Sequence, residues 1–383
     1  EPMSLGYCNV GVVVEVPDDV TDLRPGDRVV SNGAHAEFVN IGRNLVHKIP
    51  DGVTDEQGVF TVLGAIGLQG VRLCNPTFGE TIVVYGLGLI GLITIQLLKA
   101  NGCQVIGIDL DQSKVDLAKS FGVKAINPTK GFDEINYVLD QTNGNGCDGV
   151  IITASANTDS IIASSAKMSR KRGRVVLVGV IGLNIARSDF YEKEISFQVS
   201  CSYGPGRYEN NYEEKGLDYP IGFVRWTENR NFDAVLNALK AGQLVVDPLI
   251  TEKIPFKDFN KIYDNITSSL SIASILLYDE NVKIERSIEI NKRTSKASSG
   301  VLGIIGSGNF TSSTVLPILK KINADVKMLA SSEGFSSSHL AKKFNVSIST
   351  TDYKSIFKES EIDLALITTR HNSHGKLVLE AME

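Results

Sequence analysis

One hexapeptide, Gly86-Leu87-Gly88-Leu89-Ile90-Gly91, constrains the fold of this chain more than any other feature, because it has the form G-x-G-x-x-G. An apolar, β-branched run at Thr81–Tyr85 precedes it, and an apolar run at Leu89–Ala100 with helical spacing follows it. In such a unit the first glycine permits a tight turn, the second admits a diphosphate to the backbone, and the third lets the helix pack on the strand. The pattern therefore predicts a dinucleotide diphosphate at the helix N-terminus.

The next predicted strand ends in Asp109, about twenty residues beyond the first glycine, where an acid reads the ribose of the cofactor. A carboxylate there accepts hydrogen bonds from the ribose 2′-hydroxyl and repels a 2′-phosphate, which favours NAD over NADP. The alternative interpretation is a glycine turn that only packs a strand on a helix, with Asp109 as a helix cap. The predicted cofactor contacts are Gly86, Gly88, Leu89, Ile90, Gly91, Asp109 and Lys114, although an exposed helical lysine is the simpler account of the last.

Strands and helices continue to alternate after this unit. We expect a helix at residues 112–121, and buried strands at residues 149–153, 174–179 and 195–202, with a helix at about residues 160–168 between the first two. Such alternation predicts a mostly parallel, doubly wound sheet and therefore an α/β fold.

The chain before the glycine motif has a different character. Residues 1–60 are β-rich, with strands expected at residues 11–16, 27–30 and 36–41, and a helix is expected from Asp55 to about Cys74. A β-rich part therefore precedes the nucleotide fold.

Several short motifs resemble the medium-chain dehydrogenase family. Besides the glycine motif they are Pro25-Gly26-Asp27-Arg28-Val29, Ala36-Glu37-Phe38-Val39, Lys48-Ile49-Pro50-Asp51-Gly52-Val53 and Gly173-Arg174-Val175-Val176. The resemblance covers roughly residues 1–280. It implies part of a GroES-like catalytic domain at residues 1–60, an NAD(P)-binding Rossmann domain at residues 61–202, and a return segment at residues 203–280 that completes the catalytic domain.

The resemblance also implies where zinc ligands would stand, and this chain lacks them. Tyr7 takes the place of the ligand His of a Gly-His-Glu-Gly-x-Gly motif, and Ala65 that of a ligand Cys; the cysteines of a structural zinc lobe are missing between Val30 and Ala36. Tyrosine is rarely a zinc ligand and alanine cannot be one, so no metal is expected. A hydrogen-bond donor must then polarise the substrate oxygen. Tyr7 is the candidate, and a core tyrosine is the alternative interpretation.

A second cluster of candidate site residues follows the last predicted Rossmann strand. Residues 202–208 and 218–228 are dense in aromatic residues, glycine and arginine. Arg207 and Arg225 suit a clamp for the carboxylate or phosphate of a charged sugar or sugar nucleotide, because guanidinium groups bind such oxyanions with paired hydrogen bonds. A packed loop or an oligomer contact is the alternative interpretation.

A second strand–glycine–helix unit begins after residues 281–299, which lack an apolar period and are expected to form a linker. Gly306 and Gly308 take the first two glycine positions, and Asn309 and Phe310 follow them into the helix. Thr311 replaces the third glycine, which predicts looser helix packing.

The second unit has no acid at the ribose position, where Ser331-Ser332 stand instead, so it allows NADP as well as NAD. Residues 300–383 resemble the beginning of the glucose-fructose oxidoreductase and inositol dehydrogenase family. The resemblance implies that the turn around His371 passes beside the cofactor, with helix capping as the alternative role. That family's catalytic lysine would lie beyond Glu383, so we expect a truncated second Rossmann fold and a chain that is a fragment at both ends.

The net charge and the cysteine content limit the kinds of partner and the compartment that we expect for this chain. A net charge of −5 argues against nucleic acid or an anionic membrane, and five cysteines without metal or redox spacing indicate reduced thiols in a cytoplasmic protein. The apolar run at residues 82–98 is short for a bilayer span and is interrupted by glycines. A small-molecule substrate is expected, and a homo-oligomer is left open.

Together the two resemblances imply a two-domain, zinc-free oxidoreductase linked to bacterial surface-polysaccharide synthesis. It would transfer hydride to or from a sugar or sugar-derived substrate, with NAD at the first site and NAD or NADP at the second. Two alternatives stay open. One is a quinone or enoyl reductase-like activity, against which Asp109 counts because such enzymes usually prefer NADPH. The other is a non-catalytic NAD-binding module.

Overall fold

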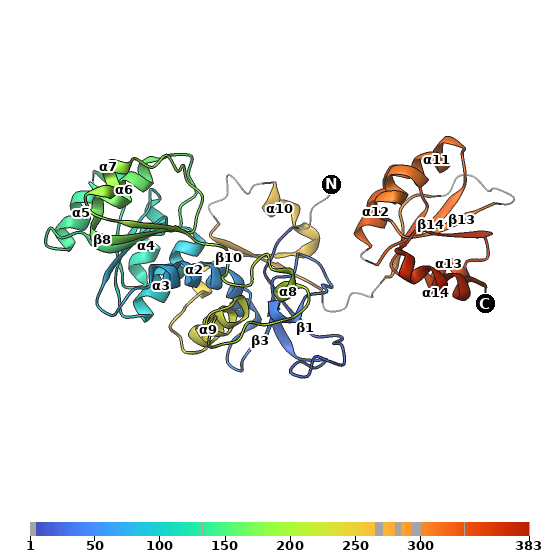
Figure 1. The fold of residues 1–383 in the computed structure, drawn as a ribbon, viewed down its shortest axis with the longest axis horizontal. Helices are drawn as coiled ribbons and strands as arrows, with labels where there is room; N and C mark the ends of the chain where they lie inside the picture. The colour runs from blue at the N-terminus through green and yellow to red at the C-terminus, as the bar shows by residue number, and fades with distance from the viewer. Residues whose placement is uncertain are drawn as a thin grey trace. The chain divides into compact units, whose positions relative to one another are not determined.

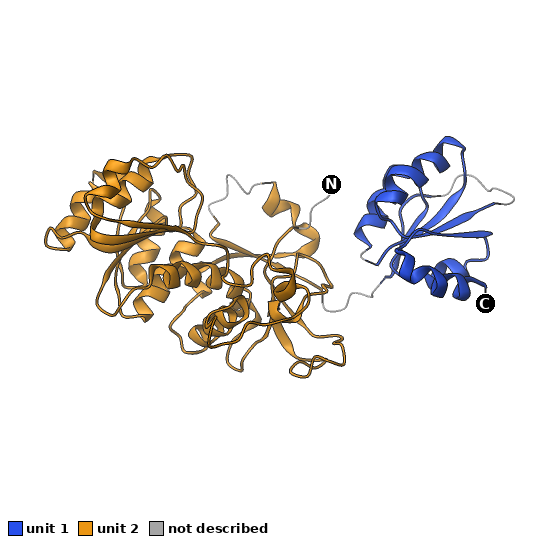
Figure 2. Ribbon diagram, viewed as in Figure 1, with its two compact units in different colours: residues 1–2, 280–383 blue, residues 3–279 orange. Residues whose placement is uncertain are grey.

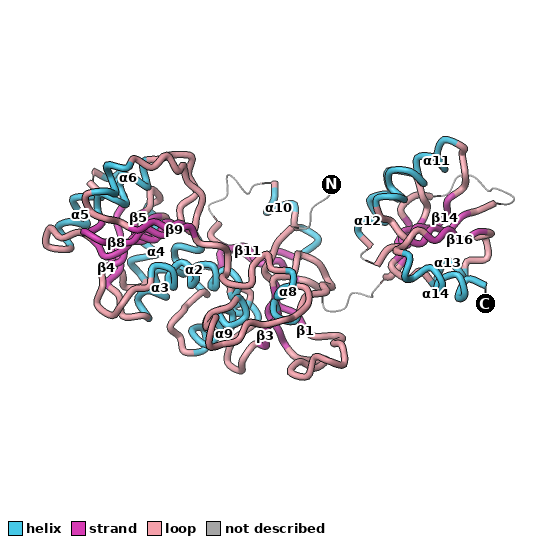
Figure 3. The backbone as a smooth tube through the Cα atoms, viewed as in Figure 1, coloured by secondary structure: helices cyan, strands magenta, loops and turns pink. Residues whose placement is uncertain are grey.

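The computed structural model describes residues 5–131, 133–264, 271–279, 285–292, 300–332 and 334–382. The chain divides into two compact units, one formed by Met3–Asp279 and the other containing Glu280–Glu383, as Figure 2 shows. Each unit contains a mainly parallel sheet with helices packed on it (Figures 1 and 3). The α/β fold class predicted from the sequence is confirmed.

The first unit begins with a three-stranded antiparallel sheet of β1 (Asn9–Val12), β2 (Arg28–Ser31) and β3 (Val46–Lys48), with β2 in the centre. The strand expected at residues 36–41 is not formed. Its place beside β2 is taken by β3, which pairs His47 with Val30. The sequence pattern located β2 but predicted no strand at Val46–Lys48.

Two helices connect this sheet to the nucleotide fold. The single helix expected from Asp55 to about Cys74 is divided into α1 (Asp55–Gly58) and α2 (Thr61–Cys74). Thr54 and Gln57 cap α1 reciprocally, each side chain accepting a hydrogen bond from the other's backbone N–H. Helix α2 is buried along most of its length and packs on helices later in the chain.

The sheet of the nucleotide fold has six parallel strands in the order β6-β5-β4-β7-β8-β9. They are β4 (Thr81–Tyr85), β5 (Gln104–Ile108), β6 (Lys124–Ile126), β7 (Cys147–Ile152), β8 (Ser169–Leu177) and β9 (Ser196–Val199). The helices are α3 (Leu89–Ala100), α4 (Gln112–Ser120), α5 (Glu134–Gln141), α6 (Ser160–Met168) and α7 (Arg187–Tyr191). The strand order reverses between β4 and β7, and ligands bind sheets of this kind at the carboxyl ends of the strands at that reversal.

The chain then returns to the β-rich part through α8 (Asn210–Glu213), α9 (Glu228–Lys240) and α10 (Asn260–Tyr263), with the parallel pair β10 (Ile250–Pro255) and β11 (Ala273–Leu277). Val235 of α9 packs on Gly64 of α2 so closely that a Cβ on the glycine would lie 2.6 Å from the valine Cγ1. One buried apolar cluster joins the N-terminal residues, α2, α3 and α9. The first 60 residues and the return segment therefore share a core.

The second unit has a five-stranded sheet in the order β12-β15-β14-β13-β16, in which only the β12–β15 pair is antiparallel. The strands are β12 (Ser287–Glu289), β13 (Leu302–Ile305), β14 (Val326–Ala330), β15 (Ile348–Thr350) and β16 (Leu364–Ile367). The helices are α11 (Leu316–Lys321), α12 (Phe335–Phe344), α13 (Lys354–Lys358) and α14 (His371–Met382). In the parts of both units that the structure describes, no helix is long and apolar enough to cross a bilayer.

Strand β12 lies inside the segment expected to be a linker. It pairs Ile288 with Ser349 at the edge of the sheet through backbone hydrogen bonds. All three of its residues are exposed, so it carries none of the apolar periodicity by which a strand is recognised. Residues 281–284 and 293–299 of the expected linker lie outside the described residues.

Candidate functional site

The glycine turn of the first unit follows β4, at the strand-order reversal. Gly86 has a φ of +98°, and a Cβ on it would lie 2.5 Å from the backbone N of Ala154. A Cβ on Gly91 would lie 2.0 Å from the Gly86 carbonyl oxygen. A Cβ on Gly88, in contrast, would meet no atom within 4 Å. Gly86 and Gly91 therefore shape the turn, while Gly88 leaves backbone open to a ligand.

Helix α3 begins at this turn without a side chain to cap it. Gly88 is the N-cap residue, and Leu89, Ile90 and Gly91 form the first helical turn. The first N–H groups of a helix have no partner within the helix and carry the positive end of its dipole. Together with the open backbone at Gly88, these groups fit a diphosphate.

Asp109 follows β5, and its carboxylate lies against the same turn. Oδ2 accepts a hydrogen bond from the Leu87 N–H at 2.6 Å, and Oδ1 accepts one from the Asp111 N–H at 2.8 Å. An ionised carboxylate offers about four lone-pair positions, so both oxygens can still accept from ribose hydroxyls. The Nζ of Lys114 lies 3.7 Å from Oδ2 of Asp111, the N-cap residue of α4. The structure thus brings Asp109 to the glycine turn and pairs Lys114 with a neighbouring acid.

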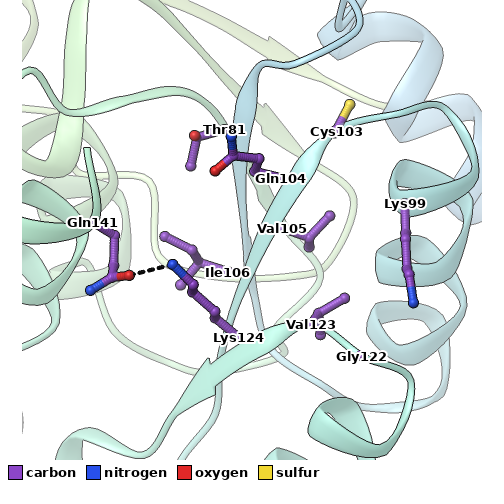
Figure 4. Close-up of a pocket in the computed structure, with 10 residues that line it drawn as sticks. All are labelled: Thr81, Lys99, Cys103, Gln104, Val105, Ile106, Gly122, Val123, Lys124 and Gln141. Carbon is purple, nitrogen blue, oxygen red and sulfur yellow. Dashed lines mark hydrogen bonds between the residues drawn. The ribbon is translucent and has the colours of Figure 1, made fainter. Parts of the chain in front are cut away.

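A separate pocket opens at the other end of the same strands (Figure 4). Thr81, Gln104 and Lys124, the first residues of β4, β5 and β6, line it with residues of the neighbouring helices and turns. The Nζ of Lys124 donates a hydrogen bond to Gln141 Oε1 at 2.5 Å. Because the glycine turn follows the last residue of β4, this pocket is not part of the nucleotide site.

The glycine turn of the second unit has the same geometry at its first two positions. Gly306 has a φ of +114°, and a Cβ on Gly308 would meet no atom within 4 Å. The helix begins at Asn309, and Phe310 is 62% exposed. The open backbone at Gly308 again fits a diphosphate.

Thr311 changes the third position of this turn. Its hydroxyl donates to the Gly306 carbonyl oxygen at 2.9 Å and lies 2.7 Å from the Thr368 hydroxyl. The helix widens into a π-helical turn at Thr311–Val315. A threonine needs room that a glycine does not, and Pro317 lacks the N–H that would continue the α-helical pattern. The sequence predicts looser helix packing at Thr311, and the structure has this wider turn there. The Thr311 hydroxyl joins the turn to Gly306 and Thr368 by hydrogen bonds.

Ser331, which follows β14, belongs to a chain of hydroxyl groups. Its Oγ accepts hydrogen bonds from the Gly334 N–H at 3.1 Å and from the Ser336 hydroxyl at 3.2 Å. Ser336 Oγ in turn lies 2.5 Å from Ser307 Oγ in the glycine turn. Hydroxyls both donate and accept, and these serine side chains carry no charge that would repel a 2′-phosphate.

His371 begins α14, directly after β16. Its ring stacks on that of His374 with the ring centres 5.4 Å apart, and His374 Nε2 lies 2.8 Å from the Thr369 carbonyl oxygen. Strand β16 pairs with β13, which leads into the glycine turn. His371 therefore lies at the same edge of the sheet as Gly306 and Gly308.

Tyr7 precedes β1, and its side chain is 49% exposed. Burial of the rest of the ring, with the neighbouring Cys8, raises its pKa, so the hydroxyl keeps its proton at neutral pH. Burial also raises the pKa of the Cys8 thiol to about 12, whereas zinc binds the thiolate. Within the described part of the chain, no three His, Cys, Asp or Glu side chains come together as metal ligands. These residues do not fit a catalytic zinc.

Two histidines, His35 and His47, have partners far along the chain. Nδ1 of His35 lies 2.9 Å from the Tyr263 hydroxyl, and its ring fills the space beside Gly6, where a Cβ would lie 2.1 Å from the ring. Burial lowers the pKa of His35. Nδ1 of His47 lies 3.0 Å from Asn229 Oδ1. Both histidines are partly buried, and His35 is a neighbour of the Tyr7 segment that the sequence could not reveal.

The structure gives Arg207 and Arg225 different partners. Arg207 donates to Glu213 Oε1 at 2.5 Å, and its guanidinium carbon lies 4.1 Å from the centre of the Tyr208 ring. The guanidinium carbon of Arg225 lies 3.7 Å from the centre of the Trp226 ring. The clamp of these two arginines therefore stays a prediction.

Glu228, the first residue of α9, is the last residue of the second cluster, and the sequence assigned it no role of its own. It is fully buried, and neither carboxyl oxygen has a hydrogen-bond donor. Burial raises its pKa to about 8; the charge of Glu213 acts in the same direction and that of Arg207 against it. A buried acid with a strongly shifted pKa beside other charged groups is typical of functional sites, although structural networks also contain such groups.

Two family models match the chain. The model for zinc-binding dehydrogenases matches residues 90–218, and the model for an oxidoreductase family with an NAD-binding Rossmann fold matches residues 301–383. The first match therefore begins in the helix that follows the first glycine turn, and the second match begins just before the second glycine turn.

Curated relatives match over most of their length. D-guloside 3-dehydrogenase of Escherichia coli is 31% identical over 262 residues, which cover 64% of this chain and 70% of that protein. (R,R)-butanediol dehydrogenase of Bacillus subtilis is 26% identical over 288 residues, covering 67% of this chain and 75% of that protein. Among solved structures, galactitol-1-phosphate dehydrogenase from Escherichia coli has a TM-score of 0.61 at 20% identity, covering 72% of this chain and 84% of that one. The last comparison shows a shared fold.

Proposed function

Because the chain belongs to the zinc-binding, medium-chain dehydrogenase family, we propose that its first unit transfers hydride between NAD and a hydroxyl or carbonyl group of a sugar or sugar-derived substrate. One observation carries the proposal: the open backbone at Gly88 lies at an uncapped helix start, beside the carboxylate of Asp109. Relatives named for sugar substrates, such as D-guloside 3-dehydrogenase, support the substrate class.

The residues around the turn have separate tasks in this proposal. The N–H groups of Leu89, Ile90 and Gly91 hold the diphosphate, and Asp109 accepts hydrogen bonds from the adenosine ribose. The bound nicotinamide supplies or accepts the hydride. The Asp109 bond to the Leu87 N–H fixes the carboxylate before any cofactor arrives. Such preorganisation lowers the cost of binding.

Tyr7 is proposed to polarise the substrate oxygen by donating a hydrogen bond to it, which is the task that a catalytic zinc ion would otherwise perform. Its raised pKa keeps the hydroxyl protonated, so it can polarise a carbonyl oxygen and protonate the alkoxide that forms on reduction. Its exposed fraction of 49% leaves it accessible to a substrate. In the same proposal, no catalytic zinc takes part.

The second unit is proposed to bind NAD or NADP at its own glycine turn. Gly306, Gly308, Asn309 and Phe310 form the open helix start, and His371 lies at the same sheet edge. The uncharged hydroxyl at Ser331 supports acceptance of either cofactor. A role for both units in polysaccharide synthesis remains a hypothesis from the sequence resemblance.

The experiment that tests the cofactor sites uses two alanine substitutions. A Cβ at Gly88 or at Gly308 enters empty space, so Gly88→Ala and Gly308→Ala should change stability by no more than about 1 kcal/mol, yet occupy the position where a diphosphate approaches. We expect Gly88→Ala to weaken NADH binding by the first unit by about tenfold or more, measured by nicotinamide fluorescence. Gly308→Ala should instead remove the cofactor sites of the second unit.

Gly222→Ala is the matched control, because a Cβ there also meets no atom within 4 Å and the residue lies outside both turns. It should bind NADH as the unaltered chain does. If Gly88→Ala binds NADH with unchanged affinity while remaining folded, the assignment of the first site is wrong.

A further inference from the structure

His35 lies against the backbone that leads into Tyr7. Its N–H donates to the Leu5 carbonyl oxygen at 2.7 Å. Its ring covers Gly6, where a Cβ would lie 2.1 Å from the ring Cδ2 and 2.2 Å from Nε2. Gly6 has a φ of +81°, in the left-handed region, so both the turn and the contact with the ring require a glycine here. The chain therefore turns under the His35 ring one residue before Tyr7.

The backbone of Tyr7 is held on its other side by the antiparallel sheet. Asn9 of β1 pairs with Ser31 of β2, and Ser31 Oγ donates to Asn9 Oδ1 at 2.6 Å. Ser31 and His35 belong to the same short stretch of chain. Tyr7 therefore lies between two points that this stretch holds, at Leu5 and at Asn9, while half of its side chain stays exposed.

Helix α10 holds His35 from the opposite direction. Nδ1 of His35 lies 2.9 Å from the Tyr263 hydroxyl, and the two ring centres are 6.3 Å apart in an edge-to-face arrangement. The Tyr263 ring also packs edge-to-face on Phe259, with the ring centres 6.2 Å apart. The return segment thus reaches the backbone before Tyr7 through the His35 ring.

We propose that His35, held by the Tyr263 hydroxyl, is a positioning residue for Tyr7. Its N–H and its ring fix the backbone at Leu5 and Gly6, and so determine where the Tyr7 hydroxyl meets the substrate oxygen. The inference rests on the proposed function, in which Tyr7 donates a hydrogen bond to that oxygen. Position matters because a displacement of about 1 Å at a reacting group can lower the rate about a hundredfold.

The contact between His35 and Tyr263 should depend on pH. The Tyr263 hydroxyl can donate to Nδ1 only while that nitrogen carries no proton. Burial lowers the pKa of His35 from 6.5, so the folded chain favours the neutral ring. The resulting stabilisation is complete above pH 6.5 and is lost as the pH falls through the lowered pKa.

The tyrosines and the cysteine around this contact keep their protons in that pH range. Burial raises the pKa of the Tyr263 hydroxyl, and it raises the pKa of the Cys8 thiol to about 12. Burial, and then the charges of Tyr263 and Glu37, raise the pKa of Tyr278 to about 12. Glu37 is exposed, and it is the acid that an experiment must separate from His35.

Backbone hydrogen exchange of the full chain, read by peptide mass spectrometry, tests the contact without a substrate. The peptide that contains His35 reports on the bond from its N–H to the Leu5 carbonyl oxygen. Corrected for the intrinsic effect of pH, its exchange should accelerate by up to about thirtyfold from pH 8 to pH 5, the limit set by a pKa of 6.5 in the open segment. Tyr263→Phe removes only the hydroxyl and should accelerate exchange about threefold to tenfold at pH 8.

His35→Phe keeps a ring on Gly6 but can neither titrate nor bond to Tyr263. It should exchange faster at pH 8 and lose the pH dependence; if it fails to fold, Tyr263→Phe carries the test. Glu37→Gln removes the neighbouring acid, and His47→Gln removes a partly buried histidine elsewhere in the β-rich part, so both should follow the unaltered chain. Unchanged exchange in Tyr263→Phe, or a pH dependence that persists in His35→Phe, would overturn the proposal.

Turnover separates positioning of Tyr7 from a purely structural contact. On the sugars or polyols that the chain reduces or oxidises, His35→Phe and Tyr263→Phe should lower kcat about tenfold, with KM and NADH affinity unchanged. His35→Asn keeps a hydrogen-bonding group near the place of Nδ1, so it should restore part of kcat. Unchanged kcat in His35→Phe and Tyr263→Phe, where Tyr7→Phe loses turnover, removes the positioning role and leaves the proposed function. Equal turnover in Tyr7→Phe, or no turnover by the unaltered chain, removes the proposed donor and the positioning role with it.

Discussion

Replacing the buried Glu228 by glutamine should change how the stability of the first unit depends on pH. In the folded chain neither Glu228 oxygen has a donor, and its acidic neighbour Glu213 already accepts from Arg207. Two carboxylates can form a hydrogen bond only if one keeps its proton. The pKa of Glu228 raised to about 8 is consistent with a Glu228 that keeps its proton beside Glu213.

The sign and size follow from proton linkage. A carboxyl whose pKa rises from 4.5 to about 8 on folding favours the folded state fully below pH 4.5, and this contribution is lost as the pH rises through 8. At about 1.4 kcal/mol per pKa unit, the loss is on the order of 5 kcal/mol. In Glu228→Gln the side chain has the same shape and no titrating group, so this component of the pH dependence should disappear.

The assay is denaturant unfolding of the first unit, followed by Trp226 fluorescence at several pH values between 5 and 9. We expect the free energy of unfolding of the unaltered chain to fall across this range, and that of Glu228→Gln to fall markedly less. Glu192→Gln, an exposed position in the same unit, is the control and should follow the unaltered chain. Parallel pH profiles for the unaltered chain and Glu228→Gln would show that Glu228 does not carry a proton into the folded state.

Two further predictions concern the cofactor and the proton donor. Asp109→Ser should lower the ratio of NADPH to NADH dissociation constants, because it removes the charge that repels a 2′-phosphate; an unchanged ratio contradicts the assignment of Asp109. It should also cost about 1–2 kcal/mol of stability, measured by denaturant unfolding, through the lost acceptors for the Leu87 and Asp111 N–H groups. Tyr7→Phe should lower kcat about a hundredfold on any sugar or polyol that the chain reduces or oxidises, with NADH affinity unchanged, and equal turnover would exclude Tyr7 as the donor.

The sequence best predicted those elements whose conformation depends on residues adjacent in the chain. The glycine turn at Gly86 depends on six consecutive residues and the strand before them, so its pattern is visible without any knowledge of the fold. The strands β4 and β13 and helix α3 were located for the same reason. Parallel strands that alternate with helices follow one connection rule, which extends the prediction to the whole sheet.

The features that sequence missed depend on residues far apart in the chain. Strand β3 is held by backbone pairing with β2, and β12 is held by backbone pairing with β15. His35 and Tyr263 stand 228 residues apart in the chain, and Glu228 is buried by side chains that a single helix pattern does not include. No local periodicity encodes such contacts.

The two glycine turns in one chain also show which parts of a nucleotide site can vary. In both turns the second glycine, Gly88 or Gly308, leaves open backbone, because any Cβ there would occupy the space of the diphosphate. The third position varies, since Thr311 is accommodated by a π-helical turn and by its hydroxyl bond to Gly306. The ribose position varies most, from the acidic side chain of Asp109 to the hydroxyl of Ser331. In the proposed sites, therefore, contact with the diphosphate constrains the backbone, while charge at the strand end is expected to set which cofactor is accepted.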